Sequence, residues 1–62
     1  MITAGIDAGA KTIKAVILRD GELVGRSMVP AGFDTREAAE KAYNQALAAA
    51  GVASKEVKAL IA

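Results

Sequence analysis

The spacing of apolar residues changes once along this chain, and that change limits the folds open to it. Ile2, Ala4 and Ile6 alternate with polar or small residues, which is the two-residue period of a β-strand. Between Asp34 and Ala50, apolar residues instead recur every three or four positions, as on one face of a helix. We therefore expect a chain that begins as a sheet and then adds a single helix.

The sheet is expected to contain four strands, predicted over residues 2–7, 12–18, 22–29 and 58–62. Asp20-Gly21 favours a type I′ turn, and the first three strands are expected to form an antiparallel meander. The helix then crosses over, so that the fourth strand lies parallel to the first. The predicted fold class is α/β (an α+β mixed sheet), with the order β-β-β-α-β.

Two of these strands carry signals of their position in the sheet. Residues 12–18 have apolar side chains on both faces toward the end of the segment, which suits a central strand covered on both sides. Arg26 and Ser27 interrupt the apolar run of residues 22–29, as in an edge strand, and Pro30 ends it.

Both ends of the predicted helix are marked in the sequence. Asp34 is followed three residues later by Glu37, which is a candidate capping box, and Gly51 stands where a helix commonly stops. Residues 54–57 are predicted as a short helical turn. The apolar face of the helix is predicted to consist of Ala39, Ala42, Tyr43, Ala46, Leu47 and Ala50.

The chain is 62 residues long and contains neither cysteine nor histidine. It therefore forms no disulfide and offers no thiolate or imidazole to a metal. A Ser-His-Asp triad, a catalytic cysteine and a cysteine-held cluster are all excluded within the chain. Because 15 of the residues are alanine, the core is expected to be thin, which suggests a chain that packs against something else.

The charge balance argues against two classes of partner. Eight basic and seven acidic residues give a net charge of +1, and Phe33 and Tyr43 are the only aromatic residues, so we expect no nucleic-acid partner. No apolar stretch approaches the length of a bilayer span, and no secretory signal is visible. We therefore expect no membrane partner and a cytoplasmic location.

The segment most informative about function is residues 5–14, GIDAGAKTIK. Asp7 ends a strand, and Gly9 follows two residues later at a bend that leads into the next strand. Backbone N–H groups at a glycine bend suit phosphate oxygens, because no side chain stands in the way. An aspartate oxygen suits Mg²⁺, either directly or through water.

Three further residues of this segment could serve the same ligand. Lys11 or Lys14 would neutralise charge on a transferred phosphoryl group, and Thr12 adds a hydroxyl donor. By spacing alone, however, D-x-G is more often an ordinary turn, and Lys14 is equally well a solvated strand residue. The segment is neither a P-loop nor a Rossmann fingerprint, because GK[ST] and G-x-G-x-x-G are both absent.

The stretch ITAGIDAGAKTIKAVILRDGELVG resembles the first phosphate hairpin of the acetate and sugar kinase, heat-shock chaperone and actin superfamily. GAKT-x-K-x-VIL, the DGE hairpin and the alanine-rich helix make the chain most similar to ATPase subunits of benzoyl-CoA reductase and activators of 2-hydroxyacyl-CoA dehydratases. The continuation through DTREAAEKAYNQALAAAGV and KEVKALIA fits the same family, so the resemblance covers nearly the whole chain.

The resemblance implies a ribonuclease H-like fold in two halves, with ATP and Mg²⁺ bound between them. It also implies that ATP hydrolysis drives an electron from a reduced [4Fe-4S] cluster to a partner reductase or dehydratase at very low potential. Asp7 would organise Mg²⁺ through its water shell, and the phosphates would be held by Gly9, Ala10, Lys11, Thr12 and Lys14. Ala10 stands where many superfamily members have Ser or Thr, so a hydroxyl contact is lost there.

Family members are several times longer than this chain. We therefore expect residues 1–62 to be the first segment of the amino-terminal ribonuclease H-like ATPase half, an incomplete domain. The adenosine pocket, the second phosphate segment and the cluster cysteines would lie after Ala62. The implied partners are ATP, the rest of the ATPase domain, and reductase or dehydratase subunits. Alone, the chain is expected not to hydrolyse ATP efficiently.

Two alternatives remain open at this point. The chain could instead be the equivalent segment of a sugar or acyl kinase from the same superfamily. It could also be a non-catalytic module for packing or assembly. A meander of this kind exposes one face of its sheet and the edge of its last strand, and such an edge invites self-association.

Overall fold

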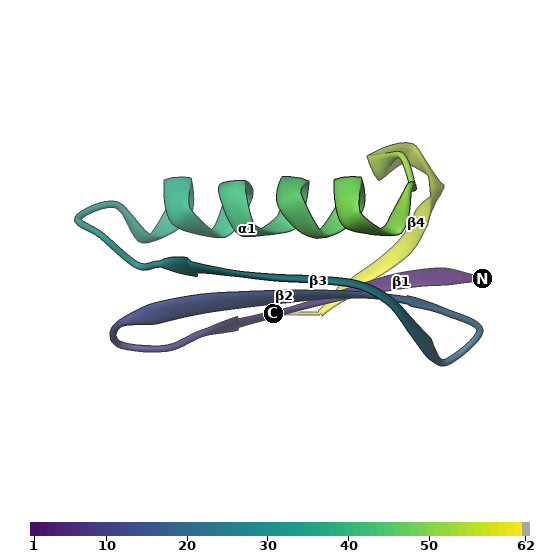
Figure 1. Cartoon of the computed structure of the whole chain (residues 1–62), viewed down its shortest axis with the longest axis horizontal. Coiled ribbons are helices and arrows are strands. Elements are labelled where there is room, and N and C mark those ends of the chain that lie inside the picture. Colours follow the sequence, from purple (N-terminus) through teal and green to yellow (C-terminus); the bar gives the residue numbers. More distant parts are fainter. Residues whose placement is uncertain (62) are drawn as a thin grey trace.

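The structure is a computed structural model, and it describes residues 1–61. The elements follow the predicted order, and Ala62, the last residue of the predicted fourth strand, lies outside the described residues (Figure 1). The strands are β1 (Ile2–Ala8), β2 (Thr12–Arg19), β3 (Glu22–Pro30) and β4 (Val57–Ile61). Between β3 and β4 lie the helix α1 (Thr35–Ala50) and the 3₁₀ turn η1 (Ser54–Glu56).

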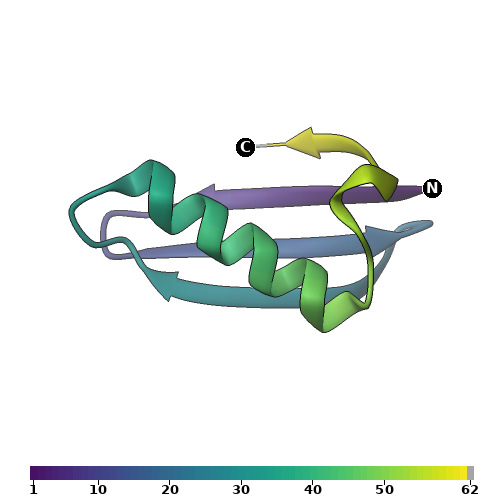
Figure 2. The same ribbon diagram turned by 90° about the horizontal axis from the view of Figure 1, so that it is seen from above.

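The four strands form one mixed sheet in the order β3-β2-β1-β4. β2 pairs antiparallel with both β1 and β3, whereas β4 runs parallel to β1 (Figure 2). The predicted meander, the crossover and the edge position of β3 are therefore confirmed. The β1–β2 register places Asp7 opposite Lys14 and Gly5 opposite Val16, which matters for the site described below.

The turn between β2 and β3 has the predicted backbone conformation. Asp20 and Gly21 both have positive φ, 51° and 86°, as a type I′ turn requires. The chain start is attached to this turn, because the amide of Asp20 donates to the carbonyl oxygen of Met1 over 2.9 Å. The amino group of Met1 in turn donates to the Asp20 carboxylate.

α1 begins and ends where the sequence predicts. The Asp34 side chain accepts a 3.2 Å hydrogen bond from the amide of Glu37, and Gly51 terminates the helix with φ of 69°. These contacts satisfy an amide of the first turn and the carbonyl oxygens of Leu47 and Ala48 in the last. Within residues 1–61, no helix has the length and hydropathy needed to cross a bilayer.

Small side chains form the contact between α1 and the sheet. The buried helix residues are Ala38, Ala42, Ala46 and Leu47, which pack on Ile13, Ala15 and Ile17 of β2 and on Val29 of β3. The apolar face was predicted to include Ala39, Tyr43 and Ala50, and these three are only partly buried at its margin. Ala38, which the periodicity did not single out, lies in the core instead.

α1 covers only one face of the sheet (Figure 1). Side chains alternate along β2, so Ile13, Ala15 and Ile17 lie beneath α1 and the residues between them lie on the other face. Within residues 1–61 nothing covers that second face, so the expectation of cover on both sides of residues 12–18 is wrong for this chain. We call it the open face, with the side chains of Asp7, Lys14, Val16, Leu23, Arg26, Met28 and Ile61.

Candidate phosphate site in the first hairpin

The loop between β1 and β2 lies at one end of the sheet and is accessible from solvent. Asp7 is the penultimate residue of β1, and every residue from Asp7 to Thr12 is exposed. The predicted bend is therefore not sealed inside the fold. A ligand could reach its backbone without displacing any part of the described chain.

The amides of the loop divide into two groups. The amide of Gly9 donates to the carbonyl oxygen of Thr12 over 2.9 Å and so closes the loop on itself. Within residues 1–61, no oxygen accepts a hydrogen bond from the amide of Ala10 or Lys11. Two successive N–H groups at the tip of the loop therefore remain open to an anion.

Gly9 is a glycine for a reason internal to the loop. A Cβ added at this position would stand 3.0 Å from the carbonyl oxygen of Thr12, the same oxygen that its amide contacts. The narrow turn thus disfavours a side chain at this position whether or not a phosphate binds. The sequence had linked Gly9 to the approach of a ligand, and the structure adds this simpler role.

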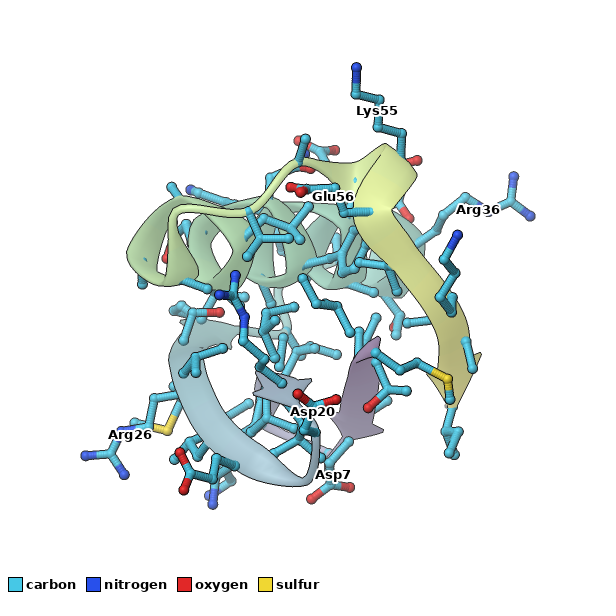
Figure 3. The ribbon with its side chains drawn as sticks, turned by 90° about the vertical axis from the view of Figure 1, so that its right-hand side faces the viewer. Asp7, Asp20, Arg26, Arg36, Lys55 and Glu56 are labelled. Carbon is cyan, nitrogen blue, oxygen red and sulfur yellow. The ribbon has the colours of Figure 1, made fainter. Side chains whose placement is uncertain are left out.

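The strand register brings the charged candidates together. Asp7 on β1 and Lys14 on β2 are directly opposed, and Thr12 lies two residues from Lys14 on the same face of β2. Figure 3 shows Asp7 below the sheet, on the side away from α1. Among residues 1–61, Asp7 and Lys14 form no ion pair with each other, so both charges remain available to a ligand.

Asp7 belongs to no cluster of three or more acidic residues among residues 1–61. Within the described chain, no three acidic residues approach closely enough to hold a metal ion. A cation at Asp7 would therefore take its remaining ligands from water and from the bound anion, which is how Mg²⁺ commonly binds with phosphates. The carboxylate of Asp7 therefore fits a Mg²⁺ ion that is also bound by a phosphate. Without a bound phosphate, Asp7 alone does not form a metal site.

The loop after β3 contacts the β1–β2 loop, a contact that was not predicted from the sequence. The amide of Ala31 donates to the carbonyl oxygen of Lys11 over 2.9 Å, so the segment after β3 lies beside the β1–β2 loop (Figure 2). Phe33 in this second loop is fully exposed at 111% of its reference area. No local signal reveals the contact, because it joins residues from distant parts of the chain.

The sequence matches no protein-family model. It is 37% identical over 59 residues to the uncharacterized protein MJ0800 of Methanocaldococcus jannaschii, covering 95% of this chain and 14% of that protein. Its fold matches component A of (R)-2-hydroxyglutaryl-CoA dehydratase from Acidaminococcus fermentans, with a TM-score of 0.82 and 31% identity. This match covers 92% of this chain and 22% of the solved chain.

The chain thus spans less than a quarter of the length of either protein. The match covers nearly all of this chain, so the predicted partial ribonuclease H-like fold is confirmed. The predicted resemblance to proteins of 2-hydroxyacyl-CoA dehydratase systems is supported over the same part of the chain. In sequence and fold, the chain is similar to one segment of a 2-hydroxyglutaryl-CoA dehydratase component A.

Proposed function

We propose that this chain is the first phosphate-binding segment of an ATPase subunit that couples ATP hydrolysis to low-potential electron transfer to an acyl-CoA dehydratase or reductase. The observation that carries the proposal is the exposed hairpin, in which Asp7 opposes Lys14 beside two amides that have no hydrogen-bond partner among residues 1–61. Its occurrence in a fold shared with a dehydratase component supports this choice over an ordinary turn. ATPase subunits of benzoyl-CoA reductases are the other group of proteins in the proposed family, beside the activators of 2-hydroxyacyl-CoA dehydratases.

Each residue of the hairpin has a separate part in this proposal. The amides of Ala10 and Lys11 would donate to phosphate oxygens, since the amide of Gly9 is already engaged. Asp7 would hold Mg²⁺ through water, and Lys14 would offset charge on the transferred phosphoryl group. Thr12 offers a hydroxyl donor on the same face as Lys14, in partial replacement of the hydroxyl that Ala10 lacks.

The electron-transfer part of the activity would belong to other segments of such a subunit. This chain has no cysteine, so its residues do not fit a [4Fe-4S] cluster, and no step of that chemistry is assigned to them. The adenosine end of ATP would likewise be bound elsewhere. What this chain would contribute is a rigid, charged anchor for the triphosphate and its cation.

The test uses a probe matched to the part of the ligand that the hairpin would hold. Tripolyphosphate with Mg²⁺ is titrated into the ¹⁵N-labelled chain, and amide chemical shifts are followed by NMR. We expect saturable shifts confined to residues 7–14, largest at the amides of Ala10 and Lys11, and dependent on Mg²⁺. Absence of any localised shift at millimolar probe would contradict the proposal.

Two substitutions separate the hairpin from general charge effects. Asp7→Asn should abolish the Mg²⁺ dependence of binding, because a neutral amide oxygen no longer attracts the hydrated cation. Asp20→Asn is the matched control, since it makes the same change in the hairpin turn at the opposite end of the sheet. Mg²⁺-dependent ATP turnover by the isolated chain, lost in Asp7→Asn, would contradict the expectation that the segment alone is inactive.

A further inference from the structure

The β1–β2 loop carries two carbonyl oxygens that are held by amides, next to the tip amides that would bind phosphate. The carbonyl oxygen of Thr12 accepts from the amide of Gly9 over 2.9 Å, a bond within the loop. The carbonyl oxygen of Lys11 accepts, also over 2.9 Å, from the amide of Ala31, which lies just beyond the end of β3 (Figure 2). One of the two bonds that shape the loop therefore comes from a distant part of the chain.

The bond from Ala31 fixes the orientation of the peptide group that joins Lys11 to Thr12. The C=O and N–H of a trans peptide group lie in one plane and point in opposite directions. The carbonyl oxygen of Lys11 is therefore directed toward the segment after β3, and the amide of Thr12 away from it. Without the bond this peptide group is free to rotate, and its carbonyl oxygen can then turn toward a bound anion and repel it.

Ala31 is itself held in place by the fold. Its side chain is only 7% exposed and belongs to the buried core. Gly32 follows with φ of 65°, a left-handed conformation that permits the sharp turn toward α1. Asp34 then caps the helix by accepting a hydrogen bond from the amide of Glu37. The amide that holds the Lys11 carbonyl oxygen is thus attached to the core and to the first turn of α1.

We propose that Ala31 is a positioning residue of the phosphate hairpin, whose amide keeps the Lys11 carbonyl oxygen away from the anion while the amides of Ala10 and Lys11 stay open to it. The proposal rests on the proposed function, since it concerns the same anion. By linkage, a bond that favours the anion-binding form of the loop is itself strengthened when the anion binds. Occupancy of the hairpin and the position of residues 31–34 are therefore coupled.

The first experiment removes the N–H group of Ala31 and leaves every side chain in place. A chain of 62 residues is accessible to chemical synthesis, with the amide bond between Pro30 and Ala31 replaced by an ester. The matched control is an ester between Arg19 and Asp20, because it removes the 2.9 Å bond to the Met1 carbonyl oxygen at the other end of the sheet.

Mg²⁺ with tripolyphosphate is the probe, and binding is followed by the amide chemical shifts of the hairpin. The ester at Ala31 should weaken binding roughly three- to tenfold, the factor that corresponds to one backbone hydrogen bond of ordinary strength. The ester at Asp20 should leave binding unchanged. Circular dichroism of both ester chains checks that the fold persists.

The second experiment uses the unmodified chain, so it decides the matter even where an ester chain fails to fold. Exchange of amide protons with water is measured by NMR with and without the probe. The amide of Ala31 should exchange roughly three- to tenfold more slowly when the probe is bound, by the same linkage. The amide of Asp20 should slow less, because its bond lies outside the site.

The outcomes separate this proposal from the proposed function. If the unmodified chain does not bind the probe, the proposed function fails and this proposal fails with it. If the unmodified chain binds, the positioning role alone is overturned by an Ala31 ester that binds as tightly, or by two esters that weaken binding equally. Slowing of exchange that is equal at Ala31 and Asp20 also overturns it, because that result reflects stabilisation of the whole fold.

Discussion

Among the individual charged residues, Asp20 has the clearest structural partner, although it lies outside the candidate site. The amino group of Met1 donates a hydrogen bond to its carboxylate and lowers its pKa below the usual range, with a smaller contribution from Arg19. The Asp20 side chain is 76% exposed, so salt and water screen this attraction. The contact nevertheless links the chain start to the β2–β3 turn.

This pairing predicts a specific pH dependence of stability. Since the folded-state pKa of Asp20 is lowered, its stabilising effect is complete above the unfolded-state pKa, near 4, and is lost as the pH falls through the folded-state pKa. The difference in unfolding free energy between the wild type and Asp20→Asn should therefore be constant from pH 5 to 7. It should shrink as the pH falls below 4, where the carboxylate of Asp20 takes up a proton.

Urea denaturation of both proteins across this pH range provides the measurement. Asn suits this comparison because it adopts positive φ about as readily as Asp, so the turn itself is preserved. A difference that persists unchanged at pH 2 would show that the carboxylate charge is not what stabilises the contact. Raising the ionic strength should reduce the difference at pH 6.

The candidate site shows how far single residues can be predicted from sequence. The spacing of Asp7, Gly9 and Lys14 located the hairpin, because strand and turn signals are local. The register that sets Asp7 opposite Lys14 follows from the length of the loop, which the sequence analysis did not use. The bond from Ala31 to Lys11 was not predictable at all, because it depends on how a later loop returns to the first.

At the scale of elements, the close approach of α1 to β3 is the most demanding feature of the packing. Gly25 is buried under the helix, and a Cβ added there would stand 2.6 Å from the carbonyl oxygen of Ala46 and 2.8 Å from the amide nitrogen of Ala50. The Ser27 hydroxyl also donates to the carbonyl oxygen of Ala42 from the same strand. Backbone, rather than flexible side chains, therefore meets the sheet here.

The substitution Gly25→Ala is expected to destabilise the fold. Neither the strand backbone nor the helix backbone can move at low energetic cost. The substitution should therefore lower the free energy of unfolding by about 1–3 kcal/mol, as in other overpacked cores. Gly5→Ala is the matched control on another strand, since its Cβ would stand 3.3 Å from a methyl group of Val16 and 3.9 Å, an ordinary contact distance, from the carbonyl oxygen of Ile61. Because the change also restricts the unfolded chain, Gly5→Ala should be nearly neutral or slightly stabilising.

Thermal and urea unfolding followed by circular dichroism compare the two variants. A Gly25→Ala protein as stable as the wild type would mean that α1 can move away from β3 without loss. The sequence predicted both elements correctly but not this contact. The reason is that alternation and helical spacing report which face is apolar, and not how closely two backbones approach.

At the scale of the whole molecule, residues 1–61 form a single sheet with one helical layer, and this arrangement distributes stability unevenly. β2 is paired on both sides, and Ile13 and Ile17 are completely buried beneath α1. Within residues 1–61, β4 is an edge strand paired with β1 alone, and from Lys58 to Ile61 all of its residues are exposed. The helix lies mainly over β2 and β3, so β4 gains little from the core (Figure 2).

Native-state hydrogen exchange should therefore resolve two levels of stability within this small chain. Hydrogen-bonded amides of β2 are expected to exchange only on global unfolding, because no smaller opening exposes them to water. Those of β4 should exchange at least tenfold faster, through local separation of Val57–Ile61 from β1, and their rates should depend only weakly on denaturant. Equal protection in the two strands, with the same denaturant dependence, would contradict this ranking, because β4 would then separate only when the core of Ile13 and Ile17 does.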